Sequence, residues 1–222
     1  MNAAEARPAW RVVLASASPR RRELLVRAGL AFEVEPAHVD EELAPGTDPV
    51  AGARLLAERK ARAVAARTRA PAIVLGADTV VAVPRGAASA LLGKPDSPAE
   101  AAAMLRMLAG TRHTVVTGVC VARTGEGAVL VDAERTLVTM RALAPHEIEA
   151  YVASGEWRDK AGGYAIQESA DRFVTALEEG GFDNVVGLPV ARALALLARA
   201  GARVPSEPSG PGGRLAREDA SR

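Results

Sequence analysis

The chain has 222 residues, 49% of them hydrophobic and 25% charged, which is long enough and apolar enough for a substantial core. Its 28 basic and 27 acidic residues leave a formal net charge of +1, so it lacks the overall basic field that attracts nucleic acid. We therefore expect no stable nucleic-acid partner, and any anion must be bound by a local cluster. A lone cysteine, Cys120, excludes an internal disulfide and a thiolate metal cage.

The N-terminal residues carry charges and a proline rather than an apolar leader, and no stretch is long enough to span a bilayer. We expect a cytoplasmic protein without a membrane partner. Residues 1–8 are expected to be flexible, residues 9–200 to form the folded domain, and the residues from 201 to 222, rich in glycine, proline, serine and charge, to be a disordered tail.

The first element is a buried strand at 12–14 that turns into a helix, with Ser18 as N-cap and Pro19 as first helical residue. Arg20, Arg21 and Arg22 occupy the first turn of this helix, where acidic residues would suit the macrodipole. Free amides, serine hydroxyls and guanidinium groups together favour a bound phosphate. A solvated basic turn is the alternative.

A short strand is predicted at 32–34 and an acidic turn at 39–42, followed by a long helix. Thr47 or Asp48 can cap this helix. Lys60 lies on its apolar stripe, either reaching out to water or neutralising a phosphate in a cleft.

The run 73–83 consists of β-formers interrupted by Gly76-Ala77-Asp78-Thr79, and it is predicted to be a buried strand that carries one carboxylate, Asp78, near its middle. An ionised carboxylate costs several kcal/mol to bury unless it is paired, hydrogen-bonded or bound to metal. Asp78 is therefore a candidate functional residue, and acceptance of backbone amides at a bulge is the structural alternative. With a carboxylate of the acidic turn, Asp78 could hold Mg²⁺.

The remaining elements follow from turn signals, caps and periodicity. They are a turn or hairpin arm at 86–91, a helix after Ser97, strands at 112–122 and 129–140, a short helix from Pro145, a strand at 172–177 and a last helix from Pro189.

Several familiar sites do not fit the spacing of the sequence. Gly93-Lys94-Pro95 does not complete a P-loop, no G-x-G-x-x-G follows a strand, and the histidines lack zinc-like spacing. A histidine-based triad stays open, although no G-x-S-x-G supports it. What remains are cations and carboxylates that suit phosphoryl chemistry: Arg20, Arg21, Lys60, Lys94, Lys160, Glu41 and Asp78.

These motifs, in this order, resemble the Maf nucleotide pyrophosphatases. The resemblance spans nearly the whole folded chain and rests on residues 15–21, 39–41, 60–61, 76–81, 93–95, 117–119, 159–167 and 184–189. It implies an α/β fold in which helices flank a twisted mixed sheet, with two lobes around a nucleotide cleft. It also implies a homodimer that cleaves a nucleoside triphosphate between its α- and β-phosphates with a divalent metal, Mg²⁺ or Mn²⁺.

The resemblance also assigns roles. Asp78 would be the proton acceptor that activates water, and Glu41 would share the metal with it. Lys60 and Lys94 would be catalytic cations, and the substrate would be bound by Ser16, Arg20, Arg21, Thr79 and Gln167.

Arg20, Thr79 and Gln167 resemble the dTTP/UTP branch of the family, whereas the 7-methyl-GTP branch has Trp, Gln and Glu at these places. Glu168 and Trp157 depart from the common pattern. A 7-methyl-GTP pyrophosphatase and a non-catalytic, nucleotide-binding regulator of cell division are the main alternatives. An RNA-binding module that uses Arg20 to Arg22 is the third, and the 3% content of aromatic residues argues against it.

Overall fold

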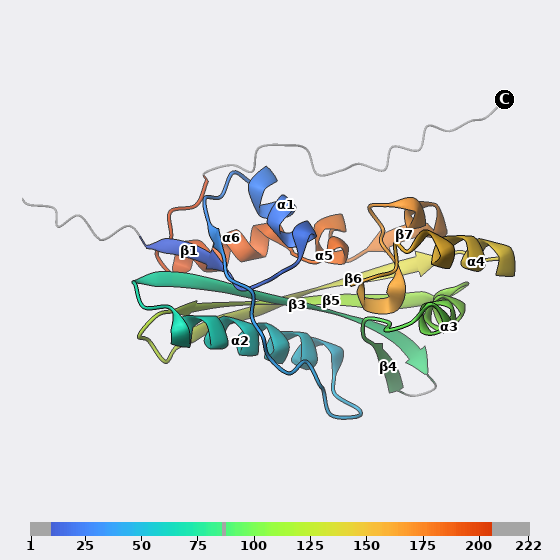
Figure 1. Ribbon diagram of the computed structural model, residues 1–222, viewed down its shortest axis with the longest axis horizontal. Coiled ribbons are helices and arrows are strands. Elements are labelled where there is room, and N and C mark those ends of the chain that lie inside the picture. Colours follow the sequence, from blue (N-terminus) through green and yellow to red (C-terminus); the bar gives the residue numbers. More distant parts are fainter. Residues whose placement is uncertain (1–9, 86–87, 206–222) are drawn as a thin grey trace, which may run out of the picture.

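The centre of the molecule is a mixed, twisted β-sheet (Figure 1). The computed structural model describes residues 10–85 and 88–205, and within them seven strands have the order β2-β1-β3-β5-β6-β7, with β4 paired to β3. Strand β1 is parallel to β2 and β3, and the other pairs are antiparallel. The strands are β1 (Arg11–Leu14), β2 (Glu33–Val34), β3 (Ala72–Arg85), β4 (Ala88–Leu92), β5 (Arg112–Arg123), β6 (Val129–Met140) and β7 (Val174–Glu178).

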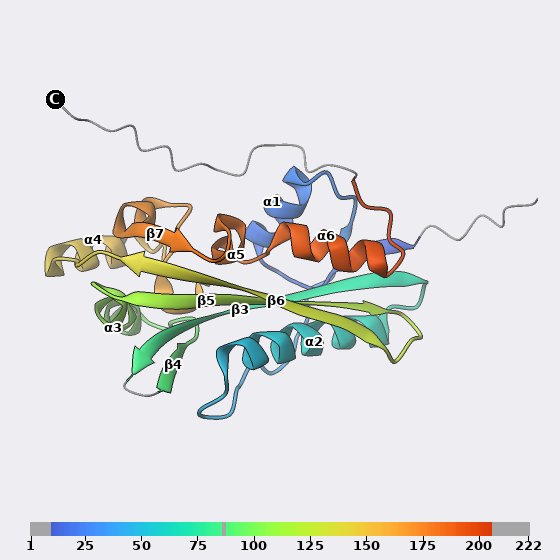
Figure 2. The same cartoon turned by 180° about the vertical axis from the view of Figure 1, so that it is seen from behind.

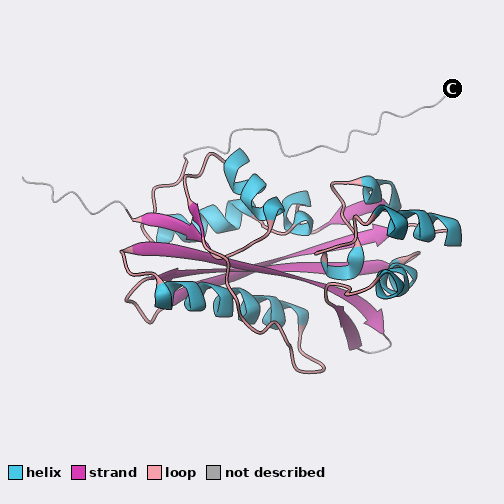
Figure 3. Ribbon diagram, in the orientation of Figure 1, coloured by secondary structure: helices cyan, strands magenta, loops and turns pink. Residues whose placement is uncertain are grey.

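Helices cover both faces of this sheet, which confirms the predicted α/β class (Figures 1 and 2). Helix α2 lies on one face, and α1, α5 and α6 lie on the other. Helices α3 and α4 gather with β4 and β7 at one end of the long strands, so two lobes share β3, β5 and β6 (Figure 3). The helices are α1 (Pro19–Arg27), α2 (Pro49–Arg67), α3 (Pro98–Leu108), α4 (Pro145–Ser154), α5 (Phe182–Val186) and α6 (Val190–Arg199).

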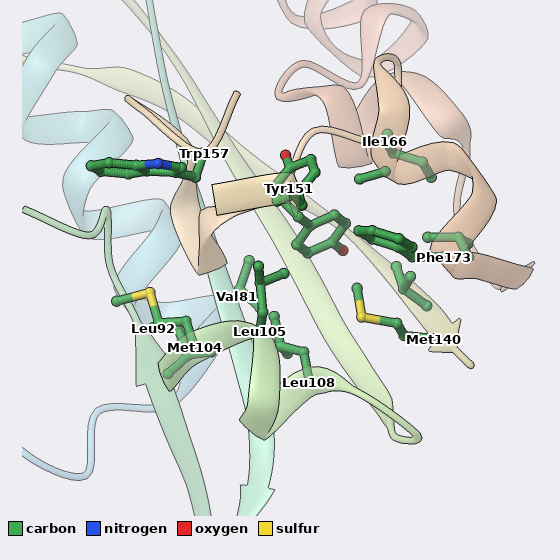
Figure 4. Packing of buried hydrophobic residues seen from close by; sticks show 14 of the residues in the cluster. Val81, Leu92, Met104, Leu105, Leu108, Met140, Tyr151, Trp157, Ile166 and Phe173 are labelled. Atoms are coloured by element: carbon green, nitrogen blue, oxygen red, sulfur yellow. The ribbon is translucent and has the colours of Figure 1, made fainter. Parts of the chain in front are cut away.

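The lobe that contains α3 and α4 has its own apolar core, seen from close by in Figure 4. Tyr151 and Phe173 meet edge to face with their centroids 5.5 Å apart, above Leu105 and Met140. Trp157 also belongs to this core and donates from its indole nitrogen to the carbonyl of Val152 over 3.0 Å. The departure from the family pattern at Trp157 is therefore a matter of core packing.

Helix α2 approaches the sheet unusually closely. A Cβ added at Gly76 of β3 would lie 2.3 Å from the carbonyl oxygen of Ala57, and one added at Gly118 of β5 would lie 2.2 Å from that of Ala53. The two glycines lie on adjacent strands, two positions apart in register because Gly76 pairs with Cys120 and Gly118 pairs with Asp78, and the helix meets them with small residues one turn apart. The backbone of α2 can therefore rest on the backbone of the sheet, and from this position the side chain of Lys60 on α2 reaches Asp78 in the middle of β3.

Most predicted elements are present, and the buried strand predicted at 73–83 is confirmed as β3, which runs through Gly76 and Asp78 in regular register with β5. Two predictions need correction. Arg172 lies in a 3-10 turn, η2 (Ser169–Phe173), and not in β7. Helix α5 and the turn η1 (Ala161–Gly163) were not predicted.

The caps agree with the sequence. The Ser18 side chain accepts from the backbone amide of Arg21, and the Asp48 side chain accepts from that of Ala51. Strand β4 confirms the hairpin arm, although Gly86 lies outside the described residues. So do residues 1–9 and 206–222, and the predicted disorder at both ends stays a prediction.

Candidate active site

A cavity of about 390 Å³ opens where the N-terminus of α1 meets the middle of β3. Segments far apart in the sequence complete its wall: residues 159–167 on one side and 185–187 on another. Eight of the predicted site residues line it, namely Ser16, Arg20, Arg21, Lys60, Asp78, Thr79, Lys94 and Gln167. Glu41 lines an adjoining depression that shares Asp78, Thr79 and Lys94 with this cavity.

Lys60 stands between two carboxylates at the bottom of the site. Its ammonium group donates to Asp78 Oδ1 and lies 2.6 Å from Glu41 Oε1. The side chains of Lys60 and Asp78 are each 7% exposed, so their charges compensate one another inside the protein. The expectation that Lys60 reaches out to water is wrong, and so is the alternative of a bulge at Asp78, since β3 and β5 stay in register there.

Glu41 connects this buried pair to the cleft surface. Its Oε2 lies 3.1 Å from the ammonium of Lys94, and its side chain is 42% exposed. Burial raises the pKa of Glu41, but the hydrogen bonds and charges of Lys60 and Lys94 outweigh that effect and lower the pKa to about 2. Glu41 is therefore ionised throughout the neutral pH range.

Arg21 is held from three directions by the protein. Its Nε donates to the carbonyl of Gly187 over 2.8 Å, Nη1 to Ser16 Oγ over 3.2 Å, and Nη2 to Thr79 Oγ1 over 3.1 Å. Burial lowers the pKa of Arg21, and the charge of Asp78 opposes this effect. Arg22 of the same turn is exposed. The basic turn thus points one of its arginines into the protein, which the solvated alternative does not explain.

Arg20 reaches the opposite wall of the cavity and donates to the carbonyl of Asp159 over 3.0 Å. Within the described residues, neither Arg20 nor Arg21 forms an ion pair. Two guanidinium groups in one cavity without a carboxylate partner leave an excess of positive charge there. That excess favours a polyanion such as a nucleotide polyphosphate.

Gln167 lies at the rim of the cavity beside Glu168. The Gln167 amide donates to Glu168 Oε1 over 3.4 Å, and the same oxygen lies 3.4 Å from the ammonium of Lys160. The carboxylate of Glu168 therefore contacts both Gln167 and Lys160. Glu168, which departs from the family pattern, lies directly beside Gln167, one of the residues that resemble the dTTP/UTP branch.

Glu41 and Asp78 offer oxygen donors of the kind that Mg²⁺ and Mn²⁺ prefer. In the described part of the chain no group of three or more acidic, histidine or cysteine side chains could hold a metal alone. The two carboxylates fit an ion that takes its other ligands from phosphate oxygens and water, which is how Mg²⁺ is usually bound in phosphoryl-transfer sites.

Tyr164 lines the cavity, and no role was predicted for it or for its partner His113. The Tyr164 hydroxyl lies 2.9 Å from His113 Nε2, and His113 is fully buried on β5. Tyr164 belongs to the 159–167 motif, but no local signal in the sequence indicated that its side chain meets that of His113. Burial lowers the pKa of His113 to about 4.

This neutral histidine gives the fold a pH dependence. The unfolded chain binds a proton at His113 below pH 6.5, whereas the folded protein does so only near pH 4, so stability is complete above pH 6.5 and falls as the pH drops to 4. We expect the loss to be roughly 3 kcal/mol, measured by urea unfolding at pH 7.0, 5.5 and 4.5. His113→Gln should flatten the profile, and His146→Gln at an exposed histidine should not. Parallel profiles for wild type and His113→Gln would show that another group titrates.

An α/β fold with a cation-rich cleft, and a carboxylate–lysine–carboxylate centre at its base, is typical of enzymes that act on phosphorylated substrates. The chain belongs to the Maf-like protein family, whose model matches residues 11–200.

Relatives of known name agree with this membership. The chain is 51% identical over 188 residues to the dTTP/UTP pyrophosphatase of Moorella thermoacetica, covering 85% of this chain and 94% of the relative. It is 48% identical over 190 residues to that of Koribacter versatilis, covering 86% and 94%. It is 49% identical over 207 residues to that of an Anaeromyxobacter species, covering 91% and 96%.

A solved nucleoside-triphosphatase / dITP/XTP pyrophosphatase from Mycobacterium abscessus aligns with 66% of this chain and 95% of its own, at 14% identity and a TM-score of 0.35. That likeness is too distant to inform the site. Among the described residues, no helix has the length and apolar character to cross a bilayer. The cytoplasmic location and the homodimer stay predictions.

Proposed function

We propose that this protein is a nucleoside triphosphate pyrophosphatase that hydrolyses dTTP and UTP to the monophosphate and pyrophosphate. The observation that carries the proposal is the buried Lys60–Asp78 pair with the partly exposed Glu41 beside it, next to a cavity in which the guanidinium groups of Arg20 and Arg21 form no ion pair with any described residue. The names of the relatives support the substrate. Arg20, Thr79 and Gln167, the residues that resemble the dTTP/UTP branch, all line this cavity.

In the proposed reaction a water oxygen forms a bond to the α-phosphorus, and the bond from that phosphorus to the oxygen bridging to the β-phosphorus breaks. The bridging oxygen leaves with its electron pair as part of pyrophosphate. Asp78 takes the proton of the attacking water. Its Oδ1 accepts a hydrogen bond from Lys60 and keeps a second lone pair for the metal, and Oδ2, which has no hydrogen-bond partner among the described residues, is the oxygen that would accept the proton.

The cations of the cleft supply the charge stabilisation. Lys60, Lys94 and Arg21 would neutralise the polyphosphate and the charge that develops on the leaving group. A divalent metal held by Glu41 and Asp78 would polarise the phosphoryl group and lower the pKa of a bound water. Lys60 lies between these two carboxylates and would also keep them oriented when no nucleotide is bound.

The test is product analysis. Purified protein is incubated with Mg²⁺ or Mn²⁺ and with dTTP, UTP, CTP, ATP, GTP and 7-methyl-GTP, and nucleotides and pyrophosphate are resolved together. We expect UMP or dTMP with equimolar pyrophosphate. Release of UDP and orthophosphate would contradict cleavage at the α–β bond, and a preference for 7-methyl-GTP would contradict the substrate. Nucleotide binding without hydrolysis under every condition would favour a regulatory protein.

A further inference from the structure

A buried chain of hydroxyl groups continues from Arg21 into the protein. Arg21 Nη2 donates to Thr79 Oγ1 over 3.1 Å, the hydroxyl oxygens of Thr79 and Thr117 are 2.9 Å apart, and Thr117 Oγ1 donates to the carbonyl of Asn184 over 2.9 Å. Thr79 lines the cavity, whereas Thr117, on β5, is fully buried behind it. The chain therefore connects α1, β3, β5 and α5 through side chains.

The two ends of this chain fix the direction of every hydrogen bond in it. A guanidinium can only donate and a carbonyl can only accept, whereas a hydroxyl has one proton. The Thr117 proton must go to Asn184, so the hydroxyl of Thr79 must donate to Thr117 and accept from Arg21. Thr79 therefore has no proton left for the substrate and offers the cavity only a lone pair.

The acceptor at the far end is itself fixed. The side-chain amide of Asn184 donates to Thr136 Oγ1 over 2.8 Å and to the carbonyl of Val115 over 3.3 Å, which ties α5 to β5 and β6. The same segment provides Gly187, whose carbonyl accepts from Arg21 Nε. Arg21 is therefore held by the 184–187 segment twice, once directly and once through Thr79 and Thr117.

We propose that Thr117 is a positioning residue that acts through Thr79 on Arg21. By closing the hydroxyl chain, Thr117 fixes the plane of the guanidinium, so that the N–H groups not used by the protein face the phosphates of the nucleotide. This inference rests on the proposed function. The substrate contact belongs to Arg21 and Thr79, and Thr117 contributes orientation.

The first test compares two substitutions at one position. Thr117→Val keeps the shape and removes the hydroxyl, and Thr117→Ser keeps the hydroxyl. We expect kcat/KM for UTP to fall about tenfold in Thr117→Val, because small misplacements of a positioning group are costly. Thr117→Ser should stay within about threefold of wild type. Thr114→Val, the same change on the opposite face of β5, is the control and should match wild type.

The second test separates positioning from general loss of structure. In a Thr79→Val background the chain is already broken, so Thr117→Val should cost nothing further. The proposal would be overturned if the losses of kcat/KM in Thr79→Val and Thr117→Val multiplied in the double variant. It would also be overturned if Thr117→Ser were as impaired as Thr117→Val. Should Thr117→Val melt below the assay temperature, Thr117→Ala, which also lacks a hydrogen-bonding group, replaces it in the same cycle.

Calorimetry with inorganic pyrophosphate measures the affinity of the anion site in the absence of any reaction. Its affinity should fall in Thr117→Val and be restored in Thr117→Ser. A wild-type protein that binds pyrophosphate with this pattern and hydrolyses no nucleotide would contradict the proposed function and support the positioning role. Equal pyrophosphate affinity in wild type and Thr117→Val would contradict the positioning role, even if UTP is hydrolysed.

Discussion

Replacing Asp78 by asparagine is expected to lower kcat on UTP by about 10³-fold, within the range that a general base contributes, while the protein stays folded and still binds nucleotide. The amide has nearly the shape of the carboxylate, so it can still accept from Lys60. What it cannot do is take a proton from water. The loss should therefore appear in kcat, with little change in the affinity for UTP.

The charge balance explains why the fold should survive this substitution. Lys60 retains Glu41 at 2.6 Å as a counter-charge, so its ammonium is not left buried without a partner. Urea unfolding and UTP binding by calorimetry check these two expectations. Asp132→Asn, the same change in a half-buried carboxylate of β6 that pairs with Arg192, is the matched control and should leave kcat unchanged. Normal turnover by Asp78→Asn would contradict the assignment of Asp78 as the general base.

Replacing Gly118 by alanine is expected to lower the free energy of unfolding by about 3 kcal/mol or more. An added methylene usually costs about 1–3 kcal/mol in a packed core, and the cost is at the upper end or higher when backbone has to move. The new Cβ would lie 2.2 Å from the carbonyl oxygen of Ala53 and 2.3 Å from its carbonyl carbon. Neither atom belongs to a flexible side chain. Helix α2 would have to move away from the sheet.

That movement would also weaken the active site, since α2 carries Lys60 and β3 carries Asp78. We expect Gly118→Ala to lose turnover on UTP even under conditions in which it remains folded. Gly127→Ala is the matched control, because a Cβ there meets nothing within 4 Å. If Gly118→Ala kept the stability and kcat of the wild type, the close contact between Gly118 and the backbone of Ala53 would be contradicted.

Local signals in the sequence predicted much of this fold. Ser18 and Asp48 cap their helices as their positions next to proline suggest, and the hairpin of β5 and β6 follows from the turn between them. The buried strand at 73–83 was predicted correctly, but the role of Gly76 was not, because a glycine inside a strand marks either a bulge or a close approach and the sequence does not say which. Here it is a close approach, by helix α2.

The candidate site was named largely through resemblance, and its residues lie together in the structure as that resemblance implied. Lys60 shows what pattern alone could not provide. On its helix it looks like a lysine at the edge of an apolar stripe, and only the fold reveals two carboxylates at its ammonium group. Thr117 and Asn184 belong to the 117–119 and 184–189 motifs, but no role was predicted for either, because their mutual hydrogen bond joins residues 67 positions apart.

The hydrogen bond between Arg21 and Gly187 spans 166 residues of sequence, nearly the whole folded chain. Ribosomes add about 5–20 residues per second, so roughly 10 to 30 seconds separate the synthesis of the arginine from that of its acceptor. During that time the basic turn at the start of α1 has been made, but the carbonyl that orients it has not. A nascent chain can therefore expose the charged residues of the cleft before it can use them, and the anion site is completed only as the last helix emerges.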